Sequence, residues 1–187
     1  MKKAAIIVEN RNIHNLDKII QSHMDKLPGW DLIHYDNMII NNGMDYNRII
    51  ADPQFWEIDY DKVLIFQHDS GLLKKGADEF LDWDYVGAPW KASASWARHD
   101  RAGGNGGLSI RDVKAHRELL KVKQYDPGMN EDVWFVHNLK NVAPFDVCQK
   151  FACETEYFLG TVGYHAIDKY LSLSQCIDIK TQYIRNE

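Results

Sequence analysis

The stretch DKVLIFQHDSGLL, residues 61 to 73, constrains the fold of this chain more than any other. Its apolar run Val63–Phe66 is followed directly by the polar residues Gln67–Ser70. A continuous run of strand-forming residues predicts a strand over Lys62–Gln67 that is buried on both faces. Ligands bind at the carboxyl ends of strands in open α/β sheets, so Asp69 becomes a candidate ligand-binding residue. The alternative is that Asp69 only caps the turn before Gly71.

A β-α-β unit is predicted at the start of the chain. Ala4–Val8 is an apolar run that ends abruptly, as a buried strand would. Apolar residues then recur at helical spacing over residues 16–27, with Asn12 or Asn15 as the N-cap, and Asp31–Asp36 predicts a second strand. Such units are almost always parallel and right-handed. The chain therefore predicts a three-layer α/β sandwich with a central, mostly parallel sheet flanked by helices.

The rest of the chain is predicted to continue this alternation of strands, helices and loops. The expected elements are a helical or turn-rich segment at Asn47–Trp56, an irregular loop at Val86–Trp90, a mobile glycine-rich loop at Ser93–Gly107, a strand at Leu108–Ile110, a helix at Asp112–Lys123, and a helix that begins at Glu131 after the N-cap Asn130. Short strands and a helix or two are expected after Val142. No internal repeat or linker-like segment interrupts the sequence, so residues 1–187 predict a single domain.

Composition argues against some classes of function. The formal net charge is −5, and charges of both signs are mixed along the chain, which gives no basic footprint for nucleic acid. Cys148, Cys153 and Cys176 lack metal-site spacing and predict free thiols in a reducing compartment, hence a cytoplasmic protein. No apolar stretch approaches the roughly 20 residues of a membrane helix, although attachment at a membrane surface stays open.

A glycine-rich motif, GGNGGLSIR, spans Gly103 to Arg111. Its glycines free the backbone to approach a ligand closely or to adopt positive φ. The spacing matches neither a dinucleotide fingerprint nor a phosphate-binding P-loop. Asn105, between the glycine pairs, offers both a donor and an acceptor to hydroxyl groups, as on a sugar. The alternative is a flexible hairpin without a ligand.

Two further motifs carry ionisable side chains. Glu131 and Asp132 are adjacent acids at a predicted helix start, where the helix dipole favours carboxylates. Either one is a candidate general base if its surroundings change its pKa. His165 follows a glycine-rich turn and is either structural or, together with Asp69, a ligand of a divalent ion.

The ordered set of motifs closely resembles a glycosyltransferase-like domain family found in bacteria, viruses and eukaryotes. The motifs are VLIFQHDSGLL, WDYVGAPW, GGNGGLSIR, NEDVWF, FACE at Phe151–Glu154, and GYH at Gly163–His165. They span roughly residues 50 to 168. The family in turn is similar to the GT-A fold, a nucleotide-binding α/β sandwich with a D-x-D-like motif after a central strand. Under that resemblance the nucleotide-binding half covers about residues 1–75, and the donor-sugar and acceptor half covers about residues 76–187.

The resemblance implies a role for each motif. Asp69 and His165 would hold Mg²⁺ or Mn²⁺ on the diphosphate of a nucleotide-sugar donor, Asp132 with Glu131 beside it would act as general base, and Trp90 would contact the acceptor. The implied donor and nucleotide residues are Val8, Asn10, Arg11, Asp36, Gln67, His68, Asp69, Gly104, Asn105, Gly106 and Gly107. The implied reaction moves a sugar to a glycan or other hydroxyl acceptor, with inversion for a direct displacement.

Two features depart from the GT-A pattern, and other functions stay open. A motif with one aspartate supplies fewer metal ligands than D-x-D, and few residues follow His165 to build an acceptor site. A partner domain, an oligomer or a membrane surface would complete that site. The main alternative is a non-catalytic nucleotide- or glycan-binding module on the same fold. A third option is a metal-dependent phosphohydrolase or nucleotidyltransferase that uses Asp69 and His165. The glycine-rich motif would not be expected in such an enzyme.

Overall fold

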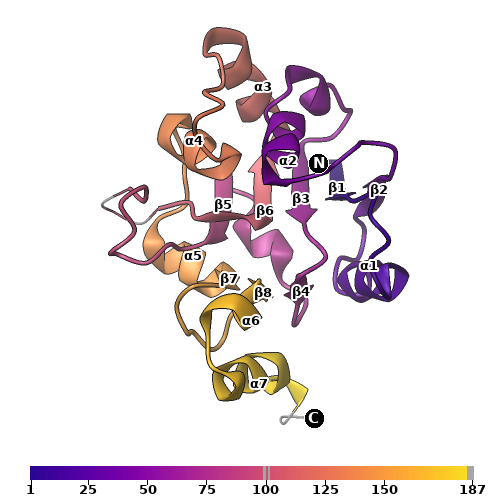
Figure 1. Ribbon diagram of the computed structural model, residues 1–187, viewed down its shortest axis with the longest axis vertical. Coiled ribbons are helices and arrows are strands. Elements are labelled where there is room, and N and C mark those ends of the chain that lie inside the picture. Colours follow the sequence, from indigo (N-terminus) through magenta and orange to yellow (C-terminus); the bar gives the residue numbers. More distant parts are fainter. Residues whose placement is uncertain (99, 101, 185–187) are drawn as a thin grey trace.

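The predicted buried strand is the middle strand of a five-stranded sheet with the order β2-β1-β3-β6-β5. The computed structural model describes residues 1–98, 100 and 102–184. The strands of this sheet are β1 (Lys3–Val8), β2 (Asp31–Tyr35), β3 (Lys62–Phe66), β5 (Tyr85–Ala88) and β6 (Asn105–Asp112). β1 pairs in parallel with β2 and β3, whereas β6 pairs antiparallel with both β3 and β5. The sheet is therefore mixed, with β6 reversed among strands that otherwise point the same way (Figure 1).

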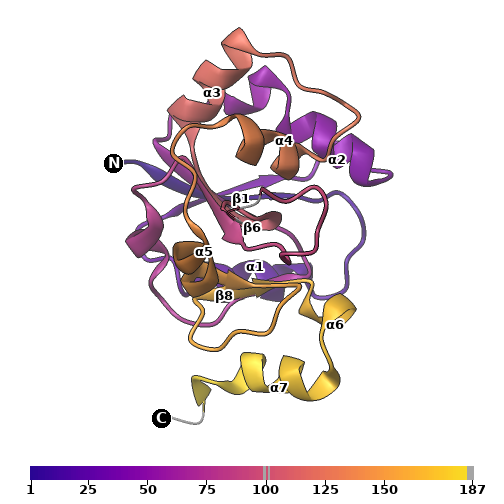
Figure 2. The same cartoon turned by 90° about the vertical axis from the view of Figure 1, so that its left-hand side faces the viewer.

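Helices flank both faces of the sheet, as the α/β pattern predicts. Helices α2 (Gly43–Ile50), α3 (Val113–Val122) and α4 (Glu131–Asn138) lie on one side. Helices α1 (Leu16–Met24) and α5 (Phe145–Phe151) lie on the other (Figure 2). Two short 3₁₀ helices, Pro53–Trp56 and Ala77–Phe80, complete the connections around the sheet.

The alternation of side chains along each strand divides the core into two parts. On β3, Leu64 and Phe66 pack with residues of α1 and α5, whereas Val63 and Ile65 pack with residues of α2 and α4. β1 divides in the same way, because successive side chains of a strand point to opposite faces. All five residues of β3 are buried. This confirms the prediction of a strand covered on both faces and explains why its apolar run is continuous rather than alternating.

A smaller three-stranded sheet lies beside the α1 and α5 layer. It has the order β4-β8-β7 and contains β4 (Ser70–Leu72), β7 (Ala152–Cys153) and β8 (Gly163–His165). Helices α6 (Ile167–Tyr170) and α7 (Leu173–Thr181) follow β8 and form the far end of the molecule (Figure 1). None of the helices in the described part of the chain combines the length and the apolar character needed to cross a membrane.

The structure corrects two sequence predictions around the glycine-rich stretch. The segment expected to be an irregular loop begins with β5, and β6 begins at Asn105, inside the stretch predicted to be mobile. Gly87 and Gly104 make this pairing possible, because an added Cβ would lie 2.1 Å from the Asn105 carbonyl oxygen and 1.9 Å from the Ala88 carbonyl oxygen, respectively. Residues 99 and 101 of the predicted mobile loop lie outside the described residues.

Helices α1 and α4 begin where the sequence predicts, but the predicted N-cap side chains do not cap them. α1 follows Asn15 and α4 follows Asn130, yet neither asparagine side chain makes a capping hydrogen bond. Asn15 adopts a left-handed conformation, and Asn130 Oδ1 instead accepts a hydrogen bond from Asn47 Nδ2 at 3.2 Å. α3 has the expected kind of cap, since the Asp112 side chain accepts from the Ala115 amide at 2.7 Å.

We expect Gly104→Ala to destabilise the protein more than Gly160→Ala. Both glycines have positive φ, +91° and +85°, but only Gly104 has backbone atoms where the Cβ would lie. A left-handed alanine costs roughly 1–2 kcal/mol by itself, and Gly104→Ala adds the clash with the Ala88 carbonyl. Urea unfolding of both variants measures the difference. Equal losses of unfolding free energy would show that β5 and β6 do not pair as described.

Candidate functional site

A cavity of about 330 Å³ lies where β1 and β3 end and β6 begins. Its walls come from segments far apart in the sequence: the ends of β1 and β3, the start of α2, the start of β6, the start of α4, and the residues from the end of β8 into α6. The lining residues are Val8, Glu9, Arg11, Ile40, Asn42, Gly43, Tyr46, Asn47, Gln67, His68, Asp69, Asn105, Gly106, Gly107, Asn130, Glu131, Asp132, His165 and Lys169.

The turn after β3 holds Asp69 in place through its backbone. The Gln67 amide donates to the Gly107 carbonyl at 2.9 Å, which extends the β3–β6 pairing by one residue. The Ser70 hydroxyl donates to the Gln67 carbonyl at 2.7 Å and closes the turn. The Ala166 amide donates to the Asp69 carbonyl at 2.9 Å. These bonds tie the turn to both β6 and the end of β8, so the Asp69 side chain has a defined place in the cavity.

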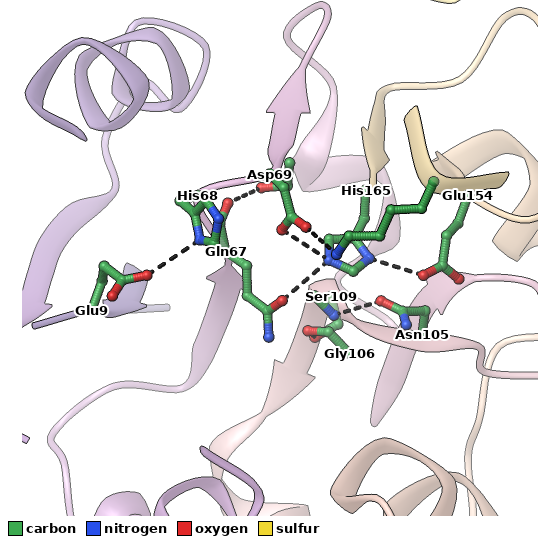
Figure 3. A network of polar contacts seen from close by, with 12 residues as sticks. Glu9, Gln67, His68, Asp69, Asn105, Gly106, Ser109, Glu154 and His165 are labelled. Atoms are coloured by element: carbon green, nitrogen blue, oxygen red, sulfur yellow. Dashed lines mark hydrogen bonds and ion pairs between the residues drawn. The ribbon is translucent and has the colours of Figure 1, made fainter. Parts of the chain in front are cut away.

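His165 lies between two carboxylates (Figure 3). Its Nδ1 is 3.0 Å from Glu154 Oε1, and its Nε2 is 3.2 Å from both Asp69 Oδ1 and Gln67 Oε1. Burial by itself lowers the pKa of His165, but the hydrogen bonds and negative charges of Asp69 and Glu154 outweigh it and raise that pKa to about 9. The imidazole is therefore a cation at neutral pH.

Asp69 is the counter-ion of two cations. Burial raises the pKa of Asp69, but His165 and Lys169, whose Nζ lies 2.7 Å from Asp69 Oδ2, hold that pKa well below its ordinary value. Asp69 Oδ1 is buried and has no partner with hydrogen-bond geometry within the described residues. The hydroxyl of Tyr46, on the wall formed by α2, is buried without such a partner too. Two polar atoms along this cavity therefore have unused hydrogen-bonding capacity.

The arrangement around Asp69 and His165 has some features of a divalent-metal site. A metal-bound histidine usually directs its other ring nitrogen at a carboxylate, as His165 Nδ1 does toward Glu154. Asp69 Oδ1 would be the second protein ligand. Within the described part of the chain, no cluster of three or more histidine, cysteine, aspartate or glutamate residues has the arrangement to hold a metal ion.

A second ion cluster joins the ends of β1 and β3. Glu9 is almost fully buried and accepts from Arg11 Nε at 2.7 Å and from Arg11 Nη2 at 2.6 Å. Glu9 Oε2 also lies 3.2 Å from His68 Nδ1 (Figure 3). Burial raises the pKa of Glu9, but the hydrogen bonds from Arg11 more than compensate and lower it. The half-exposed Arg11 guanidinium is thereby directed along the cavity wall.

Glu131 pairs with Arg111 instead of facing a substrate. The two carboxylate oxygens accept from Arg111 Nη1 at 2.6 Å and from Nη2 at 2.9 Å, and both side chains are buried. The Ser109 hydroxyl oxygen accepts from Arg111 Nε at 2.9 Å. A bidentate pair of this kind satisfies both charges away from water. Of the two adjacent acids, Glu131 therefore has its oxygens occupied.

Asp132 is the ionisable group best suited to proton transfer in this cavity. Its Oδ2 accepts from the Gly106 amide at 3.1 Å, and the side chain is partly exposed. Burial, followed by the negative charge of Glu131, raises the pKa of Asp132 from its ordinary 3.8 to about 7. A carboxylate with this pKa takes and releases a proton near neutral pH, which is the property of a general base.

The glycines of β6 leave room for these charged groups. An added Cβ at Gly106 would lie 2.5 Å from Glu131 Oε1 and 2.7 Å from Arg111 Nη2. At Gly107 it would lie 2.2 Å from His165 Nε2. Neighbouring residues of a strand face opposite ways, so the two glycines admit side chains from opposite faces of the sheet.

The cavity brings together most of the predicted site residues. Those that line it are Val8, Arg11, Gln67, His68, Asp69, Asn105, Gly106, Gly107, Glu131, Asp132 and His165. Asn10 and Asp36 are exposed and do not line it, and Asn10 Oδ1 accepts from the Ile40 amide at 3.3 Å. Gly104 serves the β5–β6 pairing instead. Trp90 lines a neighbouring cavity.

Sequence reasoning missed several residues of the site. Glu9 stands between the predicted residues Val8 and Asn10, and its position at a strand end was the available signal. Glu154 belongs to the quoted FACE motif, to which no role was given. Lys169 follows His165 at a spacing of four residues, which places it close by once a helix begins. Nothing in the sequence marked Tyr46 as a site residue, because a tyrosine in a helix is usually a core residue.

Comparisons with known proteins connect this chain to one family and to solved structures. Residues 29–165 match the family described as "Protein of unknown function (DUF5672)". No curated protein matches this chain. Solved structures that match include A197 from STIV, at 16% identity and a TM-score of 0.45 over 73% of this chain and 77% of that one. They also include the apo-form glycosyltransferase GlyE from Streptococcus pneumoniae TIGR4, at 12% identity and a TM-score of 0.51 over 92% of this chain.

The likeness to GlyE is a likeness of fold. This chain spans 55% of the GlyE chain, about half of it. The GlyE structure supports an α/β arrangement of a central sheet flanked by helices, and at 12% identity it assigns no activity or residue to this chain.

We expect Glu131→Gln to destabilise the protein strongly. The substitution leaves the buried Arg111 guanidinium without its counter-ion, which costs roughly 3–5 kcal/mol. Glu118→Gln is the matched control, because Glu118 forms an exposed pair with Lys114 at 3.8 Å and such pairs contribute about 0–1 kcal/mol. Urea unfolding measures both losses. A loss below about 1 kcal/mol for Glu131→Gln would contradict the buried pair.

We expect Asp132→Asn to gain stability over the wild type as the pH rises. The pKa of Asp132 is about 7 in the folded protein against an ordinary 3.8. Between these values the unfolded chain has released the proton and the folded protein has not, so ionisation of Asp132 favours unfolding. The difference in Tm between Asp132→Asn and wild type should therefore be larger at pH 8 than at pH 4. A difference that does not change with pH would refute the raised pKa.

Proposed function

This chain belongs to the DUF5672 family, and we propose that it is a glycosyltransferase that moves a sugar from a nucleotide-diphosphate sugar to an acceptor hydroxyl. One observation carries the proposal: Asp132, with a pKa of about 7, and the cationic group of His165 and Lys169 around Asp69 line the same cavity. A base for the acceptor and charges for the leaving diphosphate are the two requirements of this reaction. The fold likeness to the glycosyltransferase GlyE supports the same function.

The donor would lie along the wall from Arg11 to Lys169. Their side chains are 50% and 63% exposed, so both can turn toward a ligand. His165 adds a buried positive charge beside them. Together these groups would attract a diphosphate, because opposite charges attract each other near a protein surface. The unpartnered hydroxyl of Tyr46 would hydrogen-bond to the donor.

Asp132 would remove the proton of the acceptor hydroxyl. The acceptor oxygen forms its bond to the anomeric carbon while the bond from that carbon to the diphosphate oxygen breaks. The bonding electrons leave with the diphosphate, and the acceptor proton passes to Asp132. With the base and the diphosphate on opposite sides of the reacting carbon, this displacement would invert the anomeric configuration. Burial of the Asp132 carboxyl, together with the negative charge of Glu131, would keep the pKa of Asp132 near neutrality.

A divalent cation such as Mg²⁺ or Mn²⁺ would be held by Asp69 and His165, and it would take the place of the proton on His165 Nε2. The buried Asp69 Oδ1 lies 3.2 Å from His165 Nε2 and has no hydrogen-bond partner among the described residues, which supports this, as does the carboxylate behind His165 Nδ1. These cations commonly keep waters and bind substrate phosphates, so two protein ligands are enough. When bound, such a cation supplies Lewis-acid neutralisation of the diphosphate charge. Glu154 would then hold the His165 ring in position.

A non-catalytic module that binds a nucleotide or a glycan is the second candidate. The small number of protein ligands around Asp69 within the described residues favours it. Such a module would bind a nucleotide sugar without turning it over. The two candidates therefore differ in turnover and not in binding.

We expect Asp132→Asn to reduce sugar transfer by about 100-fold or more and to leave nucleotide-sugar binding nearly unchanged, as for loss of a general base. Thermal-shift screening of UDP- and GDP-sugars, with and without Mn²⁺, first identifies the donor, because bound ligand raises the Tm. Release of the nucleoside diphosphate from that donor then measures turnover. Asp146→Asn, an exposed acid that does not line the cavity, is the control.

The outcomes separate the candidates. Full turnover by Asp132→Asn would exclude Asp132 as the base. Binding without turnover by the wild type would favour the binding module. No stabilisation by any nucleotide or nucleotide sugar would count against both.

A further inference from the structure

A second cavity, of about 410 Å³, adjoins the first. Asn105, Asn130 and Asp132 line both, so the carboxylate proposed as the base faces each of them. The other walls of the second cavity come from the loop after β5, from the start of α4, from the segment after β7 and from α6. Its remaining lining residues are Trp90, Lys91, Ser93, Ala94, Ser95, Trp96, Val133, Glu154, Thr155 and Tyr170.

The second cavity is lined by aromatic rings, two of which are largely exposed. Trp96 is 54% exposed and Tyr170 is 51% exposed, whereas Trp90 is 4% exposed and belongs to the core on the α2–α4 side. Trp96 and Tyr170 come from segments more than 70 residues apart in the sequence. Large aromatic side chains normally bury most of their surface. Trp96 and Tyr170 line one cavity and remain exposed, so their rings provide flat apolar faces for a ligand.

Polar groups lie between these rings. Thr155 Oγ1 is buried and has no hydrogen-bond partner in the part of the chain that the structure describes. The Asn105 and Asn130 amides offer donors and acceptors on the side shared with the first cavity. Flat apolar faces with hydrogen-bonding groups at their edges match a sugar ring, which presents C–H groups on its faces and hydroxyls around its rim.

The charges of the second cavity disfavour a phosphorylated ligand. Its lining contains the carboxylates of Asp132 and Glu154 against the single cation Lys91. The first cavity also contains acids, but Glu9 and Glu131 are almost fully buried in ion pairs with arginines. Its most exposed charges are the cations Arg11 and Lys169, at 50% and 63% exposure. An anionic donor and a neutral ligand would therefore divide between the two cavities according to charge.

We propose that the second cavity is the acceptor subsite and takes a neutral sugar ring of a glycan, stacked on Trp96 and Tyr170. The inference rests on the proposed function for the identity of the reaction, but carbohydrate binding can be measured without it. The Thr155 hydroxyl binds a hydroxyl of the sugar. The shared position of Asp132 gives the reacting hydroxyl access to the base from this side.

Carbohydrate binding by the whole protein tests the proposal. The probes are a glycan array and saturation-transfer NMR with methyl glucosides, galactosides, mannosides and N-acetylglucosaminides. Trp96→Ala and Tyr170→Ala should each weaken binding by about tenfold or more, as expected for aromatic residues that dominate a binding site. Trp96→Phe keeps a ring and should stay within a few-fold of wild type. Tyr157→Ala is the matched control, because Tyr157 is another exposed tyrosine and does not line this cavity.

Donor assays on the same variants separate this inference from the proposed function. Unchanged stabilisation by the nucleotide sugar in Trp96→Ala, with a raised KM for the glycan acceptor, supports the subsite. Donor hydrolysis without glycan binding by wild type overturns the subsite and leaves the glycosyltransferase proposal intact. Glycan binding that needs Trp96, in a protein that binds no nucleotide sugar, supports the sugar site and contradicts the transferase. Full glycan binding by both alanine variants, or transfer only to serine and threonine peptides, overturns the subsite.

Discussion

Arg111 and Glu131 form an ion pair with almost no exposure to solvent, and this pair joins the central sheet to α4. Two buried charges are costly unless each meets its partner with good geometry, so the pair tolerates little movement of β6 against α4. Asp132 is the next residue along that helix. Its position over the Gly106 amide follows from where Glu131 is held, and the charge of Glu131 adds to the burial that raises the pKa of Asp132. The Arg111–Glu131 pair therefore fixes the place of the candidate base and contributes to its ionisation.

The glycines of β6 explain how charges from two layers reach one cavity. Gly106 leaves room for the Glu131–Arg111 pair on one face of the strand, and Gly107 leaves room for His165 on the other. A strand with ordinary side chains at both positions would push α4 and β8 away from the edge of the sheet. The motif GGNGG thus acts through missing side chains as much as through backbone freedom. Asn105 is the member of the motif that presents a side chain to both cavities.

Much of the fold could be predicted, and less of the site. The continuous apolar run of β3 predicted burial on both faces, and the β-α-β unit predicted the parallel half of the sheet. The strand β5 escaped prediction because its glycine and the following proline are typical of loops, whereas here Gly87 is needed for the close pairing with β6. The positions of Glu9, Glu154 and Lys169 along the chain did not show which groups they would pair with. Their partners lie 11 to 100 residues away, apart from Arg11.

The sequence by itself determined which segments form strands and helices and that polar residues gather where buried strands end. These properties depend on the order of apolar and polar residues along a few turns or strand positions, which is local information. Only the tertiary structure decided what the ionisable residues can do. Glu131 and Asp132 are neighbours with the same chemistry, yet one is neutralised by Arg111 and the other is left with a pKa near 7. The pKa of a carboxyl group depends on burial and on charges brought close by folding, so no pattern in the chain could assign these two roles.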